Sequence, residues 1–134
     1  MRKLTFAFAV LFVALSVTTQ AQNNIFNVRA FGATGNGQTS DTKAINKAID
    51  SAAGAGGGKV YFPAGNYLSG SIHLKSNISI YLEQGATIIA TDKDPGTEYD
   101  QEEQTVNMTY QDFGHSHFHD ALIWGENVHD VSIL

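Results

Sequence analysis

The side chains best suited to acid–base chemistry gather near the C-terminal end of the sequence. Carboxylates there come from Asp100, Glu102, Glu103, Asp112 and Asp120. Inverting glycosidases place two carboxyl groups about 6.5–9.5 Å apart, one acting as general acid and the other activating a water. These residues could supply such a pair, but an acidic run is more often a solvated loop. We therefore assign no catalytic residue here.

Three histidines, His115, His117 and His119, alternate with other residues. On an extended strand all three would face one side, an arrangement that suits zinc. A polar strand face or contacts with a sugar account equally well for the alternation, and no other side chains complete a ligand set. We favour contact with a substrate over metal, and we predict no metal ion and no organic cofactor.

Two glycine-rich stretches fail the tests for nucleotide binding. Gly58-Lys59 would end a phosphate-binding loop, but Ala53 stands where its first glycine should be and Val60 where Ser or Thr should be. The earlier glycines do not have dinucleotide-binding spacing; they stand at 32, 35 and 37. The formal charge of −5 also argues against nucleic-acid binding, which requires a basic face.

Three aromatic residues could stack on sugar rings: Tyr61, Tyr81 and Trp124. Aromatic residues within strands more often belong to a core or to a ladder across neighbouring strands, and we favour that interpretation. An acidic polysaccharide remains a compatible partner, because a few local basic side chains can line a cleft in an acidic protein.

The first 21 residues have the layout of a secretory signal peptide. Arg2 and Lys3 precede an uncharged, mostly apolar run from 4 to 17, and cleavage is expected after Ala21. The run is shorter than the roughly 20 apolar residues that span a membrane. We therefore expect a secreted or periplasmic protein that does not remain in the membrane after cleavage. No cysteine is present, so no disulfide stabilises the fold.

Residues 22–134 begin with elements that alternate in type. Residues 25–31 alternate apolar and polar side chains, which predicts a strand, and a glycine-rich loop covers 32–37. Ser40 or Asp41 is expected to cap a helix that runs to about Ala53. Ala44, Ile45, Ala48, Ile49 and Ala52 would form its apolar face.

Many short strands follow the glycine run 54–58, with tight turns between them. We expect strands over 59–62, 67–68, 71–75, 78–82, 86–90, 121–124 and 128–134. A sandwich of hairpins and a coiled stack of parallel strands both fit. Hairpin turn pairs such as Asn-Gly are missing between these strands, which favours the stack. The lone amphipathic helix would then cap its open end.

Four segments resemble a known family: 26–42 (FNVRAFGATGNGQTSDT), 56–68 (GGGKVYFPAGNYL), 74–90 (LKSNISIYLEQGATIIA) and 121–128 (ALIWGENV). The first two are similar to the start of a pectin-lyase-like right-handed β-helix. The last two resemble glycoside hydrolase family 28, the polygalacturonases and rhamnogalacturonases. The resemblance implies an all-β fold, a right-handed parallel β-helix of which residues 22–134 form the N-terminal capping helix and first coils only.

The family hydrolyses α-linked galacturonic acid polymers with inversion. Its aspartates lie in Asn-Thr-Asp and Asp-Asp motifs, followed by Gly-His-Gly and Arg-Ile-Lys motifs, and this sequence contains none of the four. We therefore expect the chain to be the first part of a pectin-degrading hydrolase and to be inactive by itself. The implied partner is pectic polysaccharide, and we expect a monomer.

Two alternatives stay open. A polysaccharide lyase on the same fold would use an Arg or Lys base, often with calcium. A non-catalytic surface protein would bind glycans through continued coils without a carboxylate cluster.

Overall fold

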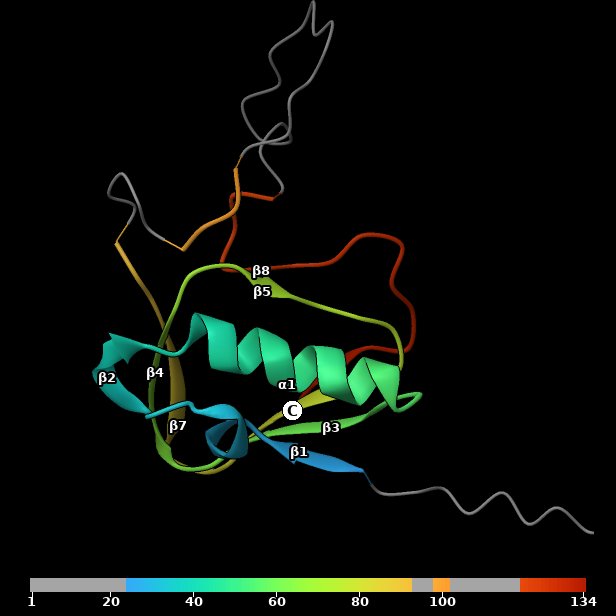
Figure 1. The fold of residues 1–134 in the computed structure, drawn as a ribbon, viewed down its shortest axis with the longest axis horizontal. Coiled ribbons are helices and arrows are strands. Elements are labelled where there is room, and N and C mark those ends of the chain that lie inside the picture. The colour runs from blue at the N-terminus through green and yellow to red at the C-terminus, as the bar shows by residue number, and fades with distance from the viewer. Residues whose placement is uncertain (1–23, 93–97, 102–118) are drawn as a thin grey trace, which may run out of the picture.

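The computed structural model describes residues 24–92, 98–101 and 119–134, and Figure 1 shows their arrangement. In chain order the elements are β1 (Ile25–Asn27), the 3-10 helix η1 (Val28–Phe31), β2 (Asn36–Ser40), α1 (Thr42–Gly54), β3 (Gly58–Phe62), β4 (Gly65–Ser69), β5 (Ile72–His73), β6 (Ile78–Leu82), β7 (Ala86–Ala90), β8 (Ile123–Trp124) and β9 (Ser132–Ile133). The signal-peptide prediction for residues 1–21 lies outside the described residues.

The strands form three parallel sheets that act as the walls of a coil. Their orders are β1-β3-β6-β9, β2-β4-β7 and β5-β8. Each wall receives one strand per turn of the chain, so Lys59 pairs with Ser79 and Gly65 with Ala86 in parallel register. Parallel crossovers turn right-handed almost without exception. The prediction of a parallel β-helix is confirmed, and the hairpin sandwich is excluded for the described strands.

Figure 1 looks onto the end of this coil, where α1 lies across the opening that the three walls frame. Ile45, Ala48, Ile49 and Ala52 are completely buried beneath it. They join a core drawn from the inner faces of all three walls, which includes Val28, Val60, Phe62, Tyr67, Ile72, Ile78 and Ile80. The helix therefore closes the coil as predicted, because its apolar face replaces the coil that would otherwise cover this core.

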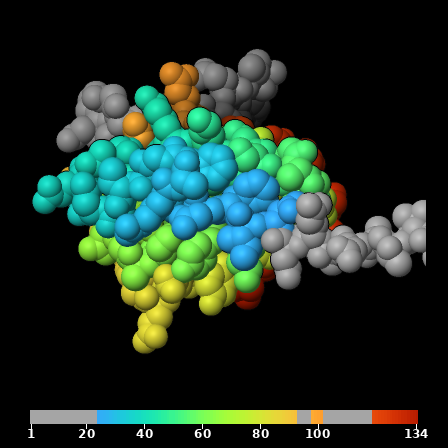
Figure 2. Space-filling view, turned by 60° about the horizontal axis from the view of Figure 1, so that its bottom comes forward, coloured from blue at the N-terminus to red at the C-terminus, as the bar shows by residue number. Residues whose placement is uncertain are grey.

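Figure 2 shows the successive turns as bands along one face. Residues before 40 form a blue and cyan band across the middle, with the teal and green of α1 above it, and lighter green and then yellow atoms of later turns lie below it. Tyr61 and Tyr81 occupy equivalent places in adjacent turns, with ring centroids 6.0 Å apart and planes at 27°. Lys59 sits 4.6 Å from the Tyr81 ring centre. The prediction of an aromatic ladder is confirmed for this pair.

The corners between walls depend on backbone geometry. The chain turns at Pro63 and Ala64 before β4, as predicted. Gly57 enters the first complete coil with φ of 123°, and a Cβ there would lie 2.5 Å from the carbonyl oxygen of Asn77. Only glycine combines that left-handed conformation with so close an approach of two backbones.

One local prediction was wrong, and a second, that Ser40 or Asp41 caps α1, is correct in position, with Ser40 Oγ accepting from Thr42 N at 3.4 Å. The strand expected over 25–31 ends at Asn27, and Val28–Phe31 forms a 3-10 turn instead. The Asn27 carboxamide accepts a hydrogen bond from Arg29 N at 3.0 Å, which starts this turn. Asp41 does stand at the N-terminus of α1, but its side chain makes no capping hydrogen bond to the helix. It turns back to the preceding loop, where Thr34 N and Gly35 N donate to it at 2.6 and 2.9 Å.

Among the described residues, no helix is both long and apolar enough to cross a membrane.

Candidate functional site

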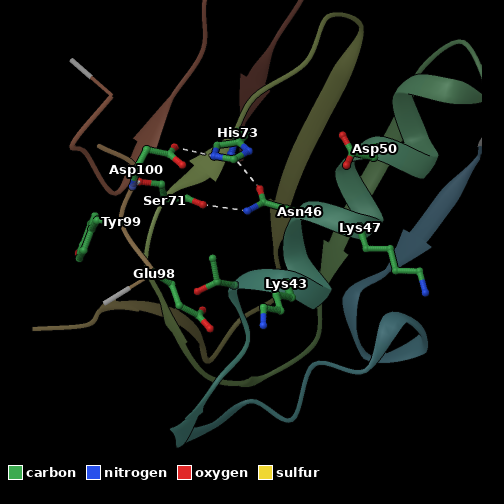
Figure 3. A pocket seen from close by; sticks show the side chains of 10 residues that line it. Lys43, Asn46, Lys47, Asp50, Ser71, His73, Glu98, Tyr99 and Asp100 are labelled. Carbon is green, nitrogen blue, oxygen red and sulfur yellow. Dashed lines mark hydrogen bonds and ion pairs between the residues drawn. The ribbon is translucent and has the colours of Figure 1, made fainter. Parts of the chain in front are cut away.

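A cavity of about 480 Å³ lies between the outer side of α1 and the segment 98–100 (Figure 3). The helix and the wall strand β5 supply one side, and the other side comes from a segment far away in sequence. The lining residues are Thr42, Lys43, Asn46, Lys47, Asp50, Ser71, His73, Glu98, Tyr99 and Asp100. The volume falls in the range typical of small-ligand pockets.

Asn46 fixes the helix to this wall. Its Nδ2 donates to the carbonyl oxygen of Ser71 at 2.8 Å, and its Oδ1 accepts from His73 N at 2.8 Å. A carboxamide can satisfy one donor and one acceptor of an extended strand at once. Because β5 has no neighbour in its sheet on the helix side, Asn46 takes the place of a further strand.

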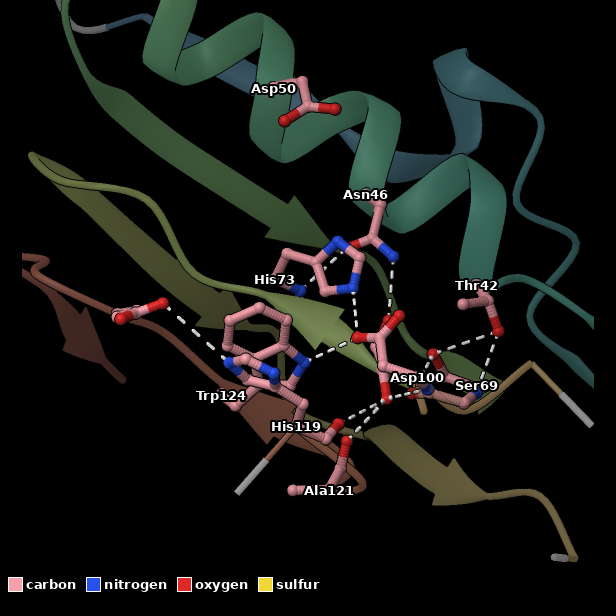
Figure 4. A network of polar contacts seen from close by, with 12 residues as sticks. Thr42, Asn46, Asp50, Ser69, His73, Asp100, His119, Ala121 and Trp124 are labelled. Atoms are coloured by element: carbon pink, nitrogen blue, oxygen red, sulfur yellow. Dashed lines mark hydrogen bonds and ion pairs between the residues drawn. The ribbon is translucent and has the colours of Figure 1, made fainter. Parts of the chain in front are cut away.

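Asp100 joins the segment 98–101 to the same wall (Figure 4). Its Oδ2 lies 2.6 Å from His73 Nε2 and accepts from Trp124 Nε1 at 2.7 Å. Its backbone N–H donates to Ser71 Oγ at 3.0 Å. The Asp100 carboxylate therefore binds one side chain from each of the neighbouring strands β5 and β8, which pair His73 with Trp124.

Two small hydroxyl residues, Ser71 and Thr42, add further hydrogen bonds beside Asn46 and Asp100. Ser71 Oγ donates to the carbonyl oxygen of Ala121 at 2.9 Å, and Thr42 Oγ1 accepts from Gly70 N at 2.8 Å. A Cβ at Gly70 would collide with the Glu98 carbonyl, whose oxygen accepts from Ser71 N at 3.0 Å. The segments around 98–100 and 119–121 are thus held on one wall, although they flank residues 102–118 in the sequence.

Trp124 lies against two imidazoles. Its ring centroid is 5.1 Å from that of His73 and 4.1 Å from that of His119, and both pairs of rings are tilted. His119 Nε2 also lies 3.9 Å from a Glu126 carboxylate oxygen. The indole is partly buried and is engaged by neighbouring side chains, as expected for a residue of the wall.

Glu98 is bound at the N-terminal end of the helix. The pKa of its carboxyl is lowered from the ordinary value, first by a hydrogen bond from Ser40, then by one from Thr42, and to a smaller extent by the charge of Lys43. Partial burial opposes this shift. These hydrogen bonds favour the ionised form of Glu98 and hold its carboxylate at the start of α1.

The interpretation of the acidic run as a solvated loop was wrong for Asp100, which binds His73 and Trp124. Asp120 and His119 also belong to the described part. Glu102, Glu103, Asp112, His115 and His117 lie outside it. Among the described residues, no three His, Cys, Asp or Glu side chains form a group that could hold a metal ion.

Sequence reasoning missed Asn46 and His73. Asn46 falls at the edge of the apolar face of α1, and only the folded structure shows that it contacts β5. His73 stands on a short strand whose pairing partner lies some 50 residues later. Neither residue belongs to a motif, so no sequence pattern marks them.

The chemistry available here is binding and positioning. Ser71 Oγ is occupied by Asp100 N and Ala121 O, so it is not poised as a nucleophile beside His73. The His73–Asp100 pair resembles the base and orienting acid of a catalytic triad, but the described residues that line the cavity supply no free nucleophile beside it.

Replacing Asp100 by Ala should release the indole N–H of Trp124. Because Trp124 is the only tryptophan of the chain, intrinsic fluorescence reports this contact directly. We expect a red-shifted emission maximum and a loss of about 1–2 kcal/mol in unfolding free energy, since a partly buried donor and the His73 ring both lose their acceptor. Asp50→Ala, at an exposed carboxylate of α1, is the matched control. Emission spectra that coincide for the two variants would contradict the assigned contact.

Comparison with known proteins places this architecture in a family. The chain belongs to the rhamnogalacturonase A/epimerase, pectate lyase-like family, whose model matches residues 25–119. The expected relationship to the pectin-lyase-like superfamily and to family 28 hydrolases is therefore confirmed.

Individual relatives differ in activity. The chain is 38% identical over 78 residues to an exo-poly-alpha-D-galacturonosidase of Dickeya chrysanthemi, covering 58% of this chain and 13% of that protein. It is 47% identical over 73 residues to mannuronan C5-epimerase AlgE3 of Azotobacter vinelandii, covering 48% and 4%. A plasmin and fibronectin-binding protein A of Streptococcus pneumoniae is 43% identical over 75 residues, covering 54% and 10%.

Among solved structures, a hyperthermoactive exopolygalacturonase of Thermotoga maritima has a TM-score of 0.66 at 28% identity. The similarity covers 85% of this chain and 24% of that one. The chain thus spans a small fraction of the relatives that it matches.

Proposed function

We propose that this chain supplies the cap and first coils of a secreted or periplasmic glycoside hydrolase that cleaves α-galacturonosidic bonds of pectic polysaccharide with inversion. The observation that carries the proposal is the match in fold and sequence to exopolygalacturonases across most of the described chain. The family motifs with catalytic aspartates are absent from residues 1–134. In this proposal those aspartates belong to later coils, since the relatives are several times longer.

The chemistry would follow the inverting scheme. One aspartic acid protonates the glycosidic oxygen while other aspartates activate a water on the opposite face of the sugar. The described residues contribute by closing the end of the β-helix and holding the wall on which later coils stack. The protein is a monomer in this proposal and needs no metal or organic cofactor.

A second candidate function is favoured by the remaining relatives. The epimerase and the plasmin- and fibronectin-binding protein share the opening coils at higher identity than the galacturonosidase does. A cap and first coils of this sequence are therefore compatible with uronate epimerisation or non-catalytic adhesion as well as with hydrolysis. The polysaccharide lyase stays a further alternative on the same fold.

The test is to incubate the complete gene product with polygalacturonate and with mannuronan. Hydrolysis predicts new reducing ends from polygalacturonate with no unsaturated, ultraviolet-absorbing product. Cleavage with an unsaturated product would identify a lyase. A change in uronate composition without cleavage would identify an epimerase, and binding without turnover would leave the adhesin function. Residues 22–134 alone should release no reducing ends, and turnover by that piece would contradict our placement of the catalytic aspartates.

A further inference from the structure

We propose that the cavity between α1 and residues 98–100 is a subsite that binds the carboxylate of an acidic sugar through Lys43 and Lys47. The inference deepens the proposed function and rests on it for the identity of the sugar, a uronate of the polysaccharide. The site lies at the capped end of the coil, on the outer side of the helix (Figure 3).

The first step concerns the acidic side chains that line the cavity. Each has a partner in the protein. Asp100 accepts from Trp124 and contacts His73, and Glu98 accepts from Ser40. Asp50 lies at the far end of the helix with its carboxylate 3.8 Å from Lys75 Nζ. The carboxylates keep their negative charge, but protein groups already engage them, so the lysines are the side chains left to meet a ligand.

The two lysines are in the opposite situation. Lys43 and Lys47 stand one turn apart on α1, and both are exposed. Within the described residues, neither ammonium lies within ion-pairing distance of a carboxylate. Lys43 influences Glu98 only as a minor contribution to its lowered pKa. Both positive charges come from the same helix at one side of the cavity, and an anionic ligand there would be attracted to each of them.

The second step concerns size and shape. A volume of about 480 Å³ accommodates one or two sugar residues. The floor is fixed, because Asn46 uses both ends of its carboxamide to hold β5. Tyr99 lies on the side opposite the helix and presents an aromatic ring at the rim. Polar side chains at a rigid floor, lysines on one side and an aromatic ring on the other match an acidic sugar better than an apolar ligand.

The experiment titrates the purified protein with trigalacturonate, with its methyl ester and with trimannuronate, following amide chemical shifts by NMR. We expect trigalacturonate to shift resonances of α1 and of residues 98–100, with an affinity that falls as salt rises. The double variant Lys43→Gln/Lys47→Gln should weaken binding about fivefold to tenfold, because two charge-assisted contacts are lost. Lys43→Arg/Lys47→Arg should retain binding.

Lys59→Gln is the control, because it removes a half-exposed positive charge that lies over Tyr81 on the β1-β3-β6-β9 wall, away from the cavity. The proposal is overturned if the methyl ester binds as well as the acid, if the double Gln variant binds like Lys59→Gln, or if neither uronate shifts these resonances. Binding of trimannuronate alone would keep the uronate subsite and contradict the pectic substrate. If the complete gene product cleaves polygalacturonate but shows no binding at this cavity, the pectic substrate is supported and the uronate subsite is contradicted.

Discussion

Replacing Asp41 by Ala should destabilise the protein by about 3–4 kcal/mol, the largest effect that we expect from a single polar side chain. Asp41 is 1% exposed, and its carboxylate accepts hydrogen bonds from Thr34 N, Thr34 Oγ1 and Gly35 N. Removal leaves these partly buried loop donors without their acceptor, and each unsatisfied buried donor costs about 1–3 kcal/mol. The measurement is the unfolding free energy from urea denaturation.

Two variants sharpen this test. Asp41→Asn retains one carbonyl acceptor and should lose about half as much stability, because charge-assisted bonds are stronger than neutral ones. Asp50→Ala removes a carboxylate from the exposed side of the same helix and should change stability by less than about 0.5 kcal/mol. Equal losses for Asp41→Ala and Asp50→Ala would show that the buried hydrogen bonds are not what holds the loop.

Replacing Ile49 by Ala should cost about 3 kcal/mol or more and loosen the cap. Ile49 is completely buried where α1 closes the coil. A buried Ile-to-Ala change costs about 2–5 kcal/mol, from lost transfer energy and from the cavity left behind. Ile89→Ala makes the same chemical change at a side chain that is 37% exposed on β7, so it should cost about 1 kcal/mol or less.

Amide hydrogen exchange shows which part of the protein Ile49→Ala destabilises. If α1 caps the core, Ile49→Ala should speed exchange of the amides of β3, which lies beneath the helix, more than those of β7. A variant that loses stability uniformly, or an Ile49→Ala cost equal to that of Ile89→Ala, would contradict the capping role.

The architecture could be predicted from the sequence because its determinants are local. The apolar spacing on α1 and the turn residues at Pro63 and Gly65 each specify one element, and together they leave few ways to arrange short parallel strands. The 3-10 turn after Asn27 was missed because the alternating pattern over 25–31 is typical of a strand. The Asn27 side chain instead accepts a hydrogen bond from Arg29 N, which ends the strand.

The candidate site could not be predicted in the same way. Asp100, His73 and Trp124 meet only because β5 and β8 are neighbours across a separation of about 50 residues. The acidic composition around Asp100 indicates a solvated loop. Nothing in the neighbouring sequence shows that the Trp124 indole N–H and the His73 imidazole bind the Asp100 carboxylate. Asn46 is likewise an ordinary helical side chain until the coil brings a strand against it.

Our central proposal is that the complete protein is an inverting galacturonan hydrolase and that this chain forms its cap and first coils. Its most direct test is time-resolved proton NMR of the first products that the complete gene product releases from α-linked polygalacturonate. The account predicts that the β-anomer of the new reducing end appears first and then mutarotates. An α-anomer appearing first, or an unsaturated uronate at the new chain end, would contradict it.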